Sequence, residues 1–392
     1  MRPLDGIVVL DLTRLLPGAV TTTLLSQFGA EIIKIEEPGR GDYAREMPPL
    51  INGEGAYFVL TNYGKKSIAI DLKDPRGRES FLKLLERADV LVEGFRPGVM
   101  QRLGLDFEIL RKRNERLIYA AITGYGQHGP YAQRAGHDIN YLSLSGVLGL
   151  NATNGHAPVI PGVQIADLAG GAMQAVIGIL LALTARQKLG QGQMIDVAML
   201  DGAIMLQTVP LAHHLATGRE PEPGGELLTG RYACYNIYKT KDERWLSVGA
   251  LEPKFWATLC RALDCEALIP HQFAEQQSEM IATLAKIFVN KDAAEWFALL
   301  GPTETCVTPV NSVVEMISDP HIRERETVIG VEHPTVGTLA RLGVAPKLSE
   351  TPGRLDFSPP PRLGQHTREV LQWAGITDDE IDELKQMRVI QE

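Results

Sequence analysis

The first 126 residues alternate between short apolar runs and segments with helical spacing, and this alternation limits the fold more than any other feature. The apolar runs cover residues 6–13, 31–38, 66–73, 90–95 and 117–126. Apolar strands separated by helices predict a parallel sheet that is covered on both faces. We therefore expect an α/β chain with a large Rossmann-like domain, whose ligands bind at the carboxyl ends of the strands.

The turn between the first predicted strand and helix, DLTRLLPGA, lacks the glycines that phosphate-binding loops use. It contains neither a GxGxxG fingerprint nor a Walker sequence. The cysteines Cys234, Cys260, Cys265 and Cys306 have neither CxxC nor zinc-ligand spacing. We therefore expect no NAD, no metal ion, and reduced thiols in a cytoplasmic protein.

Charge and hydropathy narrow the possible partners of the chain. Among 392 residues, 39 basic and 48 acidic side chains give a net charge of −9, which argues against nucleic-acid binding. The N-terminal apolar run is short and interrupted by aspartate, so it predicts no signal peptide. The longest apolar stretch, residues 175–185, is too short to span a bilayer and predicts a buried helix. We expect a soluble protein without a membrane partner.

A change in composition divides the chain into parts. Residues 1–200 contain the strand–helix repeat and are the predicted large Rossmann-like domain, whereas residues 215–230 are rich in Gly, Pro and Glu. We expect a linker at 201–229 and a smaller α+β domain, with one hairpin and three helices, at 230–325. The Pro-rich segment 326–392 ends in a charged helix and is expected to return to the large domain.

Two stretches of the large domain carry candidate catalytic groups. In AGHDINY, His137 follows a loop rich in Gly, Gln and Pro, and Asp138 is suited to cap the apolar segment after it. In IADLAGG, Asp167 precedes Gly170 and Gly171, where a helix cap and a catalytic acid would occupy the same position. The N–H groups of that first turn can hold an oxyanion, and the glycines leave space for a substrate. An acid beside an oxyanion site suits chemistry alpha to a carbonyl.

Glu252 ends a predicted strand of the small domain and precedes Pro253, a favoured first helical residue. It is either a helix cap or, if the small domain closes over the first site, a partner that orients His137. Basic residues at the expected strand ends of the large domain favour a phosphate-bearing ligand. They are Arg40, Lys65, Lys66, Lys73, Arg96 and Arg102.

Several motifs together resemble the family III CoA-transferases and, within them, the α-methylacyl-CoA racemases. The superfamily is indicated by PLDGIVVLDLTRLLPG, GAEIIKIEEPGRGD and DLKDPRGRESFLKLLERADVLVEGFRPGVMQRLGL. The racemase branch is indicated by GHDINY, ADLAGG and the EP of VGALEP, so the resemblance covers nearly the whole chain. It implies that His137 and Asp167 transfer protons, that Glu252 hydrogen-bonds the histidine, and that the chain forms an interlocked homodimer.

The resemblance also implies that an acyl-CoA thioester binds to the large domain and that its CoA moiety is the only cofactor. One position departs from the pattern, because Glu37 stands where some racemases carry an arginine, and Arg40 is the expected substitute. The implied ligand contacts are Arg40, Ile70, Asp71, Leu72, Lys73, Gly94, Phe95, Arg96, Arg102, Gly136, Asp138, Tyr141, Ala166, Gly170 and Gly171.

The sequence leaves the reaction and the acyl group open. A racemase of 2-methylacyl-CoA would transfer one proton through an enolate between His137 and Asp167, with the backbone of Asp167 polarising the thioester oxygen. A CoA-transferase would instead use Asp167 as a nucleophile that forms a mixed anhydride and then an enzyme–CoA thioester. A catalytically silent acyl-CoA-binding protein is a third hypothesis. GHDINY favours racemisation, and whether Glu252 acts within its own chain or across a dimer stays open.

Overall fold

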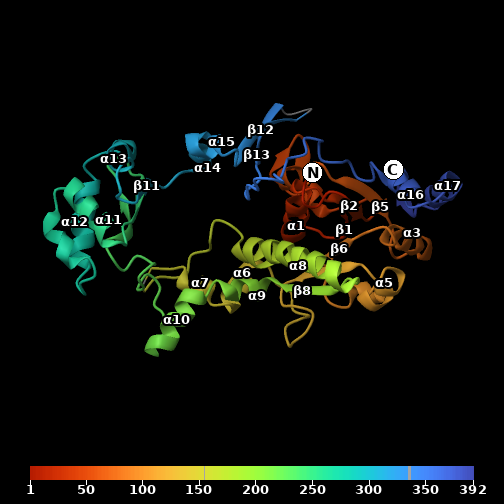
Figure 1. The fold of residues 1–392 in the computed structure, drawn as a ribbon, viewed down its shortest axis with the longest axis horizontal. Coiled ribbons are helices and arrows are strands. Elements are labelled where there is room, and N and C mark those ends of the chain that lie inside the picture. The colour runs from red at the N-terminus through yellow and green to blue at the C-terminus, as the bar shows by residue number, and fades with distance from the viewer. Residues whose placement is uncertain (154, 334–336) are drawn as a thin grey trace. The chain divides into compact units, whose positions relative to one another are not determined.

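The computed structural model describes residues 1–153, 155–333 and 337–392 (Figure 1). The chain forms two compact units, and each has its own hydrophobic core. The first unit consists of residues 1–145, 161–207 and 320–392, and the second consists of residues 146–160 and 208–319.

Seven strands of the described chain form the central sheet of the first unit. Their order across the sheet is β14 (Ile390–Gln391), β5 (Lys66–Ile70), β2 (Glu31–Glu36), β1 (Val8–Asp11), β6 (Val90–Glu93), β7 (Ile118–Thr123) and β8 (Met194–Ala198). All neighbours are parallel except β14, which pairs antiparallel with β5 at the edge. The mainly parallel sheet of a mixed α/β fold confirms the prediction, whereas β14 was not predicted.

Side chains that alternate along the strands explain why helices cover both faces of this sheet. Val9 and Leu10 are neighbours in β1, yet each is buried in a different core. Leu10 shares its core with Phe81 and Leu371, and Val9 shares the other with Ile179. The strands are therefore apolar on both sides, as expected for buried parallel strands. The helices that supply these cores are α1 (Leu16–Gln27), α3 (Pro75–Leu85), α5 (Phe107–Arg113), α8 (Gln174–Leu189), α16 (Thr367–Trp373) and α17 (Asp378–Gln386).

Shorter elements complete the first unit. The segment between β6 and β7 forms two helices, because Gly104 adopts φ 68° between them. A positive φ of this kind ends a helix and favours glycine. The remaining elements are the 3₁₀ turn η1 (Tyr43–Arg45), β3 (Leu50–Ile51), β4 (Glu54–Gly55), α2 (Ala56–Thr61), α4 (Val99–Arg102), α6 (Asp138–Leu144), the π-helical turn η2 (Ala166–Met173), α9 (Met199–Met205), α15 (Pro320–Glu324), β12 (Val328–His333) and β13 (Gly337–Leu342).

The second unit contains the predicted hairpin, whose turn carries the sequence KDE. Its strands β9 (Tyr235–Lys239) and β10 (Trp245–Gly249) pair antiparallel, and β11 (Val307–Pro309) extends the sheet. Part of the predicted linker 201–229 is helical instead, because helix-forming residues continue to Thr217 before the Gly- and Pro-rich stretch begins. The helices of this unit are α7 (Val147–Leu150), α10 (Thr208–Thr217), α11 (Pro253–Ala262), the 3₁₀ helix η3 (Glu266–His271), α12 (Ser278–Phe288), α13 (Ala293–Leu300) and α14 (Val313–Ser318).

The apolar segment predicted as a helix at 175–185 belongs to one longer helix, Ala166–Leu189, which combines η2 and α8. By length and composition this helix could cross a membrane, with mean hydropathy 1.9, and 39% of its most apolar window is buried. The prediction of a buried helix therefore holds for one face only. Ile179 is fully buried, whereas Leu181 is 65% exposed.

Glycines let η2 and α9 approach each other closely. A Cβ atom on Gly202 would lie 2.4 Å from the Cα atom of Gly170. A Cβ atom on Gly170 would lie 2.4 Å from the carbonyl oxygen of Met199. Both distances are far shorter than van der Waals contact, so any larger residue would separate the two backbones. This contact holds η2, which carries Asp167, against α9 within the first unit.

The variant Gly202→Ala should therefore lower the free energy of unfolding by about 2 kcal/mol, because the added methyl group overpacks a backbone contact. Urea denaturation of the purified chain measures the difference. Gly162→Ala is the matched control, since a Cβ atom there meets nothing within 4 Å. Equal stability of the two variants would contradict the importance of the close approach.

Candidate active site

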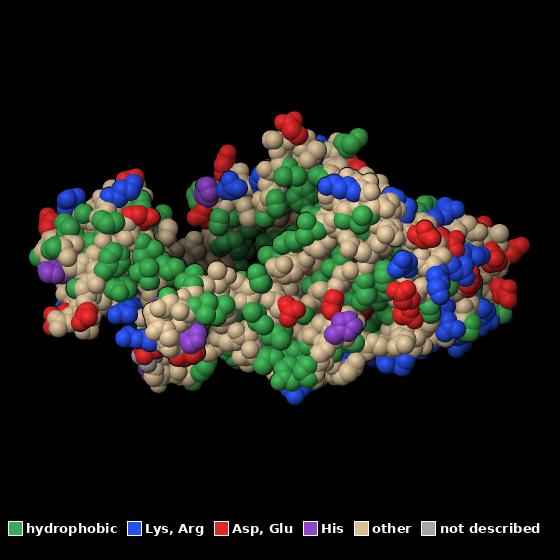
Figure 2. Space-filling view, turned by 60° about the horizontal axis from the view of Figure 1, so that its bottom comes forward, with side chains coloured by type: hydrophobic (Ala, Val, Ile, Leu, Met, Phe, Trp, Pro, Cys, Tyr) green, Lys and Arg blue, Asp and Glu red, His purple; other side chains and the backbone are tan. Residues whose placement is uncertain are grey.

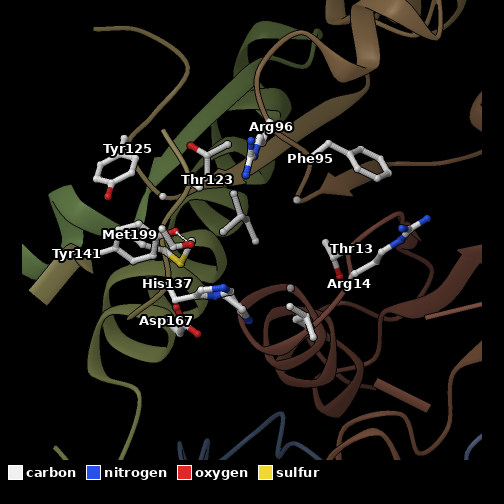
Figure 3. Close-up of a pocket in the computed structure, with 18 of the residues that line it drawn as sticks. Thr13, Arg14, Phe95, Arg96, Thr123, Tyr125, His137, Tyr141, Asp167 and Met199 are labelled. Atoms are coloured by element: carbon white, nitrogen blue, oxygen red, sulfur yellow. Dashed lines mark hydrogen bonds between the residues drawn. The ribbon is translucent and has the colours of Figure 1, made fainter. Parts of the chain in front are cut away.

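A cavity of about 340 Å³ lies at the carboxyl ends of β1, β6 and β7 (Figure 3). Loops after these strands, together with the first residues of α1 and the residue before α6, form its wall. This position agrees with the rule that parallel sheets bind ligands at the carboxyl edge. Lining residues include Thr13, Arg14, Leu15, Gly18, Tyr43, Gly94, Phe95, Arg96, Thr123, Tyr125, Arg134, Gly136, His137, Tyr141, Asp167 and Met199.

His137 immediately precedes α6 and lines this cavity. Its backbone is extended, with φ −131° and ψ 175°, and its N–H donates to Asn140 Oδ1 at 3.0 Å. The backbone thus starts the helix, and Figure 3 shows the imidazole ring extending into the cavity. A ring at such a position can reach a bound ligand.

Asp167 enters the same cavity from η2 and lies beside His137 in Figure 3. Burial raises the pKa of the Asp167 carboxyl group to about 6, and the negative charge of Asp138 contributes in the same direction. The electrostatic interaction with His137 lowers the pKa of Asp167, which agrees with the position of the two side chains beside each other. A carboxyl group with this pKa can give and take a proton near neutral pH.

Asp138 has a different role from the helix cap that the sequence predicted. It is the first residue of α6, and its Oδ1 accepts a hydrogen bond from the Asp167 N–H at 3.0 Å. This bond ties the two candidate catalytic elements together. It also occupies the amide that we expected to polarise a thioester oxygen, so the structure corrects that expectation for Asp167.

Gly170 and Gly171 do not line the cavity, contrary to their predicted role in leaving space for a substrate. Gly170 contacts the backbone of α9, and a Cβ atom on Gly171 would lie 2.9 Å from Met199 Cγ and 3.2 Å from Pro17 Cβ. These glycines therefore permit helix packing. Ala166 is likewise buried in the same helix.

The structure separates the predicted CoA contacts into two groups. Gly94, Phe95, Arg96, Gly136 and Tyr141 line the cavity with the two candidate catalytic residues. The others lie outside its wall, and for them a contact with a ligand stays a prediction. They are Arg40, Ile70, Asp71, Leu72, Lys73, Arg102, Asp138, Ala166, Gly170 and Gly171.

Two basic residues that were expected at strand ends, Lys65 and Lys66, do not lie there. Lys65 and Lys66 lie at the start of β5, at the opposite edge of the sheet from the strand ends. Lys66 pairs with Glu31 at 2.9 Å and Glu369 at 2.7 Å. Lys65 is buried in the protein interior, and burial lowers its pKa to about 7.

Glu37, the departure from the racemase pattern, is paired with cations of the same chain. Lys73 Nζ lies 2.8 Å from Glu37 Oε1, and Arg14 lies 3.5 Å from Oε2. The hydrogen bond from Lys73 lowers the pKa of Glu37 below its ordinary value. A phosphate bound at Lys73 would therefore share that lysine with a carboxylate.

Several wall residues were not predicted. Thr13 and Arg14 directly follow β1, so the rule that placed ligands at strand ends could have identified them. Glu93 lies behind the wall, where its Oε2 accepts the Phe95 N–H at 2.6 Å. Burial raises the pKa of Glu93 to about 7.

Glu252 belongs to the second unit, where it immediately precedes α11. Its backbone is extended, and its side chain makes no capping hydrogen bond to the helix. Glu252 therefore occupies the predicted N-cap position, but through its backbone and not through a side-chain hydrogen bond. Its negative charge raises the pKa of the exposed thiol of Cys306, after the larger effect of burial.

The part of the chain that the structure describes contains no group of three or more His, Cys, Asp or Glu side chains that could hold a metal ion.

Comparisons with known proteins agree with this fold. Residues 4–367 match the model of CoA-transferase family III, so the chain belongs to this family. It is 36% identical to human alpha-methylacyl-CoA racemase over 391 residues, which cover 99% of this chain and 97% of that protein. It is also 36% identical to mouse succinyl-CoA:glutarate CoA-transferase over 380 residues, covering 95% and 86%. The crystal structure of a CAIB/BAIF family protein from Brucella suis aligns with TM-score 0.83 and 28% identity, covering 95% and 99% of the two chains.

The variant Asp167→Asn should stabilise the chain in a pH-dependent way. The folded pKa of about 6 exceeds the ordinary value of 3.8, so ionisation of Asp167 costs stability as the pH rises through this interval. Asparagine removes that cost, and its advantage should grow from about pH 4 to pH 6 and then remain constant. Thermal unfolding of both proteins between pH 4.5 and 8 measures it. A difference in midpoint that does not change with pH would contradict the assigned pKa.

Proposed function

We propose that this chain racemises 2-methylacyl-CoA thioesters by 1,1-proton transfer through an enolate. The observation that carries the proposal is the presence of His137 and Asp167 in the wall of one cavity. The α-proton of a thioester is weakly acidic, so its removal requires a positioned base and stabilisation of the developing oxyanion. Inversion then requires an acid on the other face of the same carbon.

In one direction, Asp167 as the carboxylate takes the α-proton and the C–H electron pair moves into the enolate. Protonated His137 then gives a proton to the opposite face, and the carbonyl re-forms. The reverse direction exchanges the two roles. Each group is worth about 10²–10⁴ in rate as a general acid or base.

The oxyanion needs donors other than the Asp167 amide, which is engaged by Asp138. We place them in the first turn of α6, where the N–H groups of Asp138 and Ile139 precede the first intrahelical hydrogen bond. The start of α1 at Leu16 adds positive potential, because Leu15 and Gly18 line the same cavity.

A CoA-transferase is the second candidate, because racemase and transferase relatives have the same identity to this chain. A transferase would use ionised Asp167 to attack the thioester carbonyl, which forms a mixed anhydride and releases CoA thiolate. The thiolate then attacks the Asp167 carbonyl of the anhydride, so that the acyl group leaves as a carboxylate and an enzyme–CoA thioester remains. That sequence does not require a histidine beside the aspartate. We favour racemisation because His137 is present and reaches the cavity.

We also propose that the chain acts as a homodimer and that Glu252 reaches His137 in that assembly. Apolar side chains exposed on α8 and α9 of the first unit support an association, and Figure 2 shows apolar side chains spread over one face of the molecule. The exposed members on these two helices include Ile177, Leu180, Leu181, Ile204 and Met205.

Incubation with a 2-methylacyl-CoA in D₂O, without an acceptor acid, should place deuterium at the α-carbon and invert its configuration. His137→Gln should reduce this exchange by about 10²–10⁴-fold, because one proton carrier is lost. Binding of the CoA ester, measured by calorimetry, should persist. His128→Gln, which changes a histidine outside the cavity wall, is the matched control.

Two outcomes would contradict racemisation. One is unchanged exchange in His137→Gln. The other is absence of exchange in the wild type together with trapping of an activated Asp167 by hydroxylamine in the presence of acyl-CoA. The second outcome would assign the chain to CoA transfer.

A further inference from the structure

Charged side chains are buried together beneath the cavity, and neither proton transfer nor ligand charge accounts for them. They come from β1, β2 and the segments that follow β2 and precede β5. Burying ionised groups is costly unless they are paired and hydrogen-bonded, so a cluster of this size requires a specific arrangement. Its buried members are Asp11, Lys34, Glu36, Asp42 and Lys65.

Three hydrogen bonds from this cluster converge on Thr13. Lys34 Nζ donates to the Thr13 carbonyl oxygen at 2.9 Å. The Thr13 N–H and hydroxyl both donate to Asp11 Oδ1, at 2.9 Å and 2.6 Å. Lys34 is itself held by Asp42 Oδ2 at 2.8 Å. Every polar group of Thr13 is therefore bound from the protein interior, although the residue lines the cavity.

The same aspartate also fixes the first turns of α1. Thr22 Oγ1 donates to Asp11 Oδ2 at 2.7 Å. Lys65 Nζ donates to Thr22 Oγ1 at 2.8 Å and to the Ala19 carbonyl oxygen at 3.1 Å. Asp11 thus connects the end of β1 with the helix that follows it.

Between these two anchored segments the chain passes through Leu15, which adopts φ 64° and ψ −163°. This conformation is unfavourable for a residue with a side chain and persists only where the surroundings enforce it. Leu15 lines the cavity, and Figure 3 shows Thr13 and Arg14 across the cavity from His137.

We propose that Asp11 and Lys34 are positioning residues that hold the strained loop Thr13–Leu15 as the cavity wall facing His137 and Asp167. They do not touch the reacting atoms. By fixing this wall they set where a thioester lies relative to the two proton carriers, and a misplacement of 1 Å can reduce a rate about 10²-fold. The inference rests on the proposed function for the identity of the ligand.

The test uses variants that keep the charge of the interior balanced. Lys34→Met/Asp42→Asn removes the ion pair as a unit, and Thr13→Val removes the hydroxyl donor without changing the shape of the side chain. Thr13→Ser restores the donor. The matched control is Arg186→Met/Asp89→Asn, which removes another ion pair of the first unit, 2.8 Å long and remote from the cavity wall.

For the wild type and each variant, urea denaturation gives the stability, and α-proton exchange gives kcat and KM. We expect kcat/KM to fall about 10–100-fold in Lys34→Met/Asp42→Asn and in Thr13→Val. We expect Thr13→Ser to recover most of the loss and the control pair to stay within about twofold of the wild type at comparable stability. A kcat/KM that follows stability alone, with the control as impaired as the others, would overturn the proposal.

A binding measurement separates this inference from the proposed reaction. If the wild type shows no α-proton exchange, calorimetry with the same 2-methylacyl-CoA still measures how the loop Thr13–Leu15 affects binding. An approximately tenfold weaker Kd in Thr13→Val, recovered in Thr13→Ser, would support the positioning role. Equal Kd values for these proteins would overturn it, whatever reaction the chain catalyses.

Discussion

Parallel pairing of β1 with β2 on one side and β6 on the other determines where a ligand can bind. The chain proceeds from β1 to β2 and β5, and then continues on the other side of β1 with β6 and β7. At such a reversal, the loops after the two adjacent strands diverge and leave a crevice at the carboxyl edge. Thr13 follows β1 and Phe95 follows β6, and both line the cavity. Sheet topology thus creates the site before any catalytic side chain is considered.

The fold could be predicted because its main signals are local. Apolar runs bounded by turns identified β1, β2, β5, β6 and β7, and the parallel sheet followed from their alternation with helices. The edge strand β14 is only two residues long and depends on distant contacts, such as the hydrogen bond from Thr367 Oγ1 to the Gln391 carbonyl oxygen at 2.6 Å. The exposed face of α8 was missed because periodicity cannot distinguish a core helix from one that is apolar on both faces.

A position in the cavity wall was predictable where a residue type and a strand end coincide, as at Arg96. It was not predictable where a role depends on three-dimensional neighbours. Lys65 was taken for a ligand contact because it is basic and near a strand, but only the structure shows it beneath α1. Gly170 was taken for a gap beside a substrate, but its neighbour is the backbone of α9. The residue type determines the chemistry of a side chain, and packing determines which groups the side chain contacts.

The environment of Asp167 bears on the choice between the two proposed reactions. A nucleophilic carboxylate must be ionised, and a raised pKa lowers the ionised fraction near neutral pH. A residue that both accepts and returns a proton works best with a pKa near the working pH. In this chain, burial and Asp138 raise the pKa of Asp167 to about 6. The Asp138 carboxylate also accepts a hydrogen bond from the Asp167 N–H, and Asp138 is the first residue of the helix that follows His137. Asp138 therefore affects the pKa of Asp167 and also links the positions of Asp167 and His137. That coupling supports the proposed proton transfer over the alternative CoA transfer.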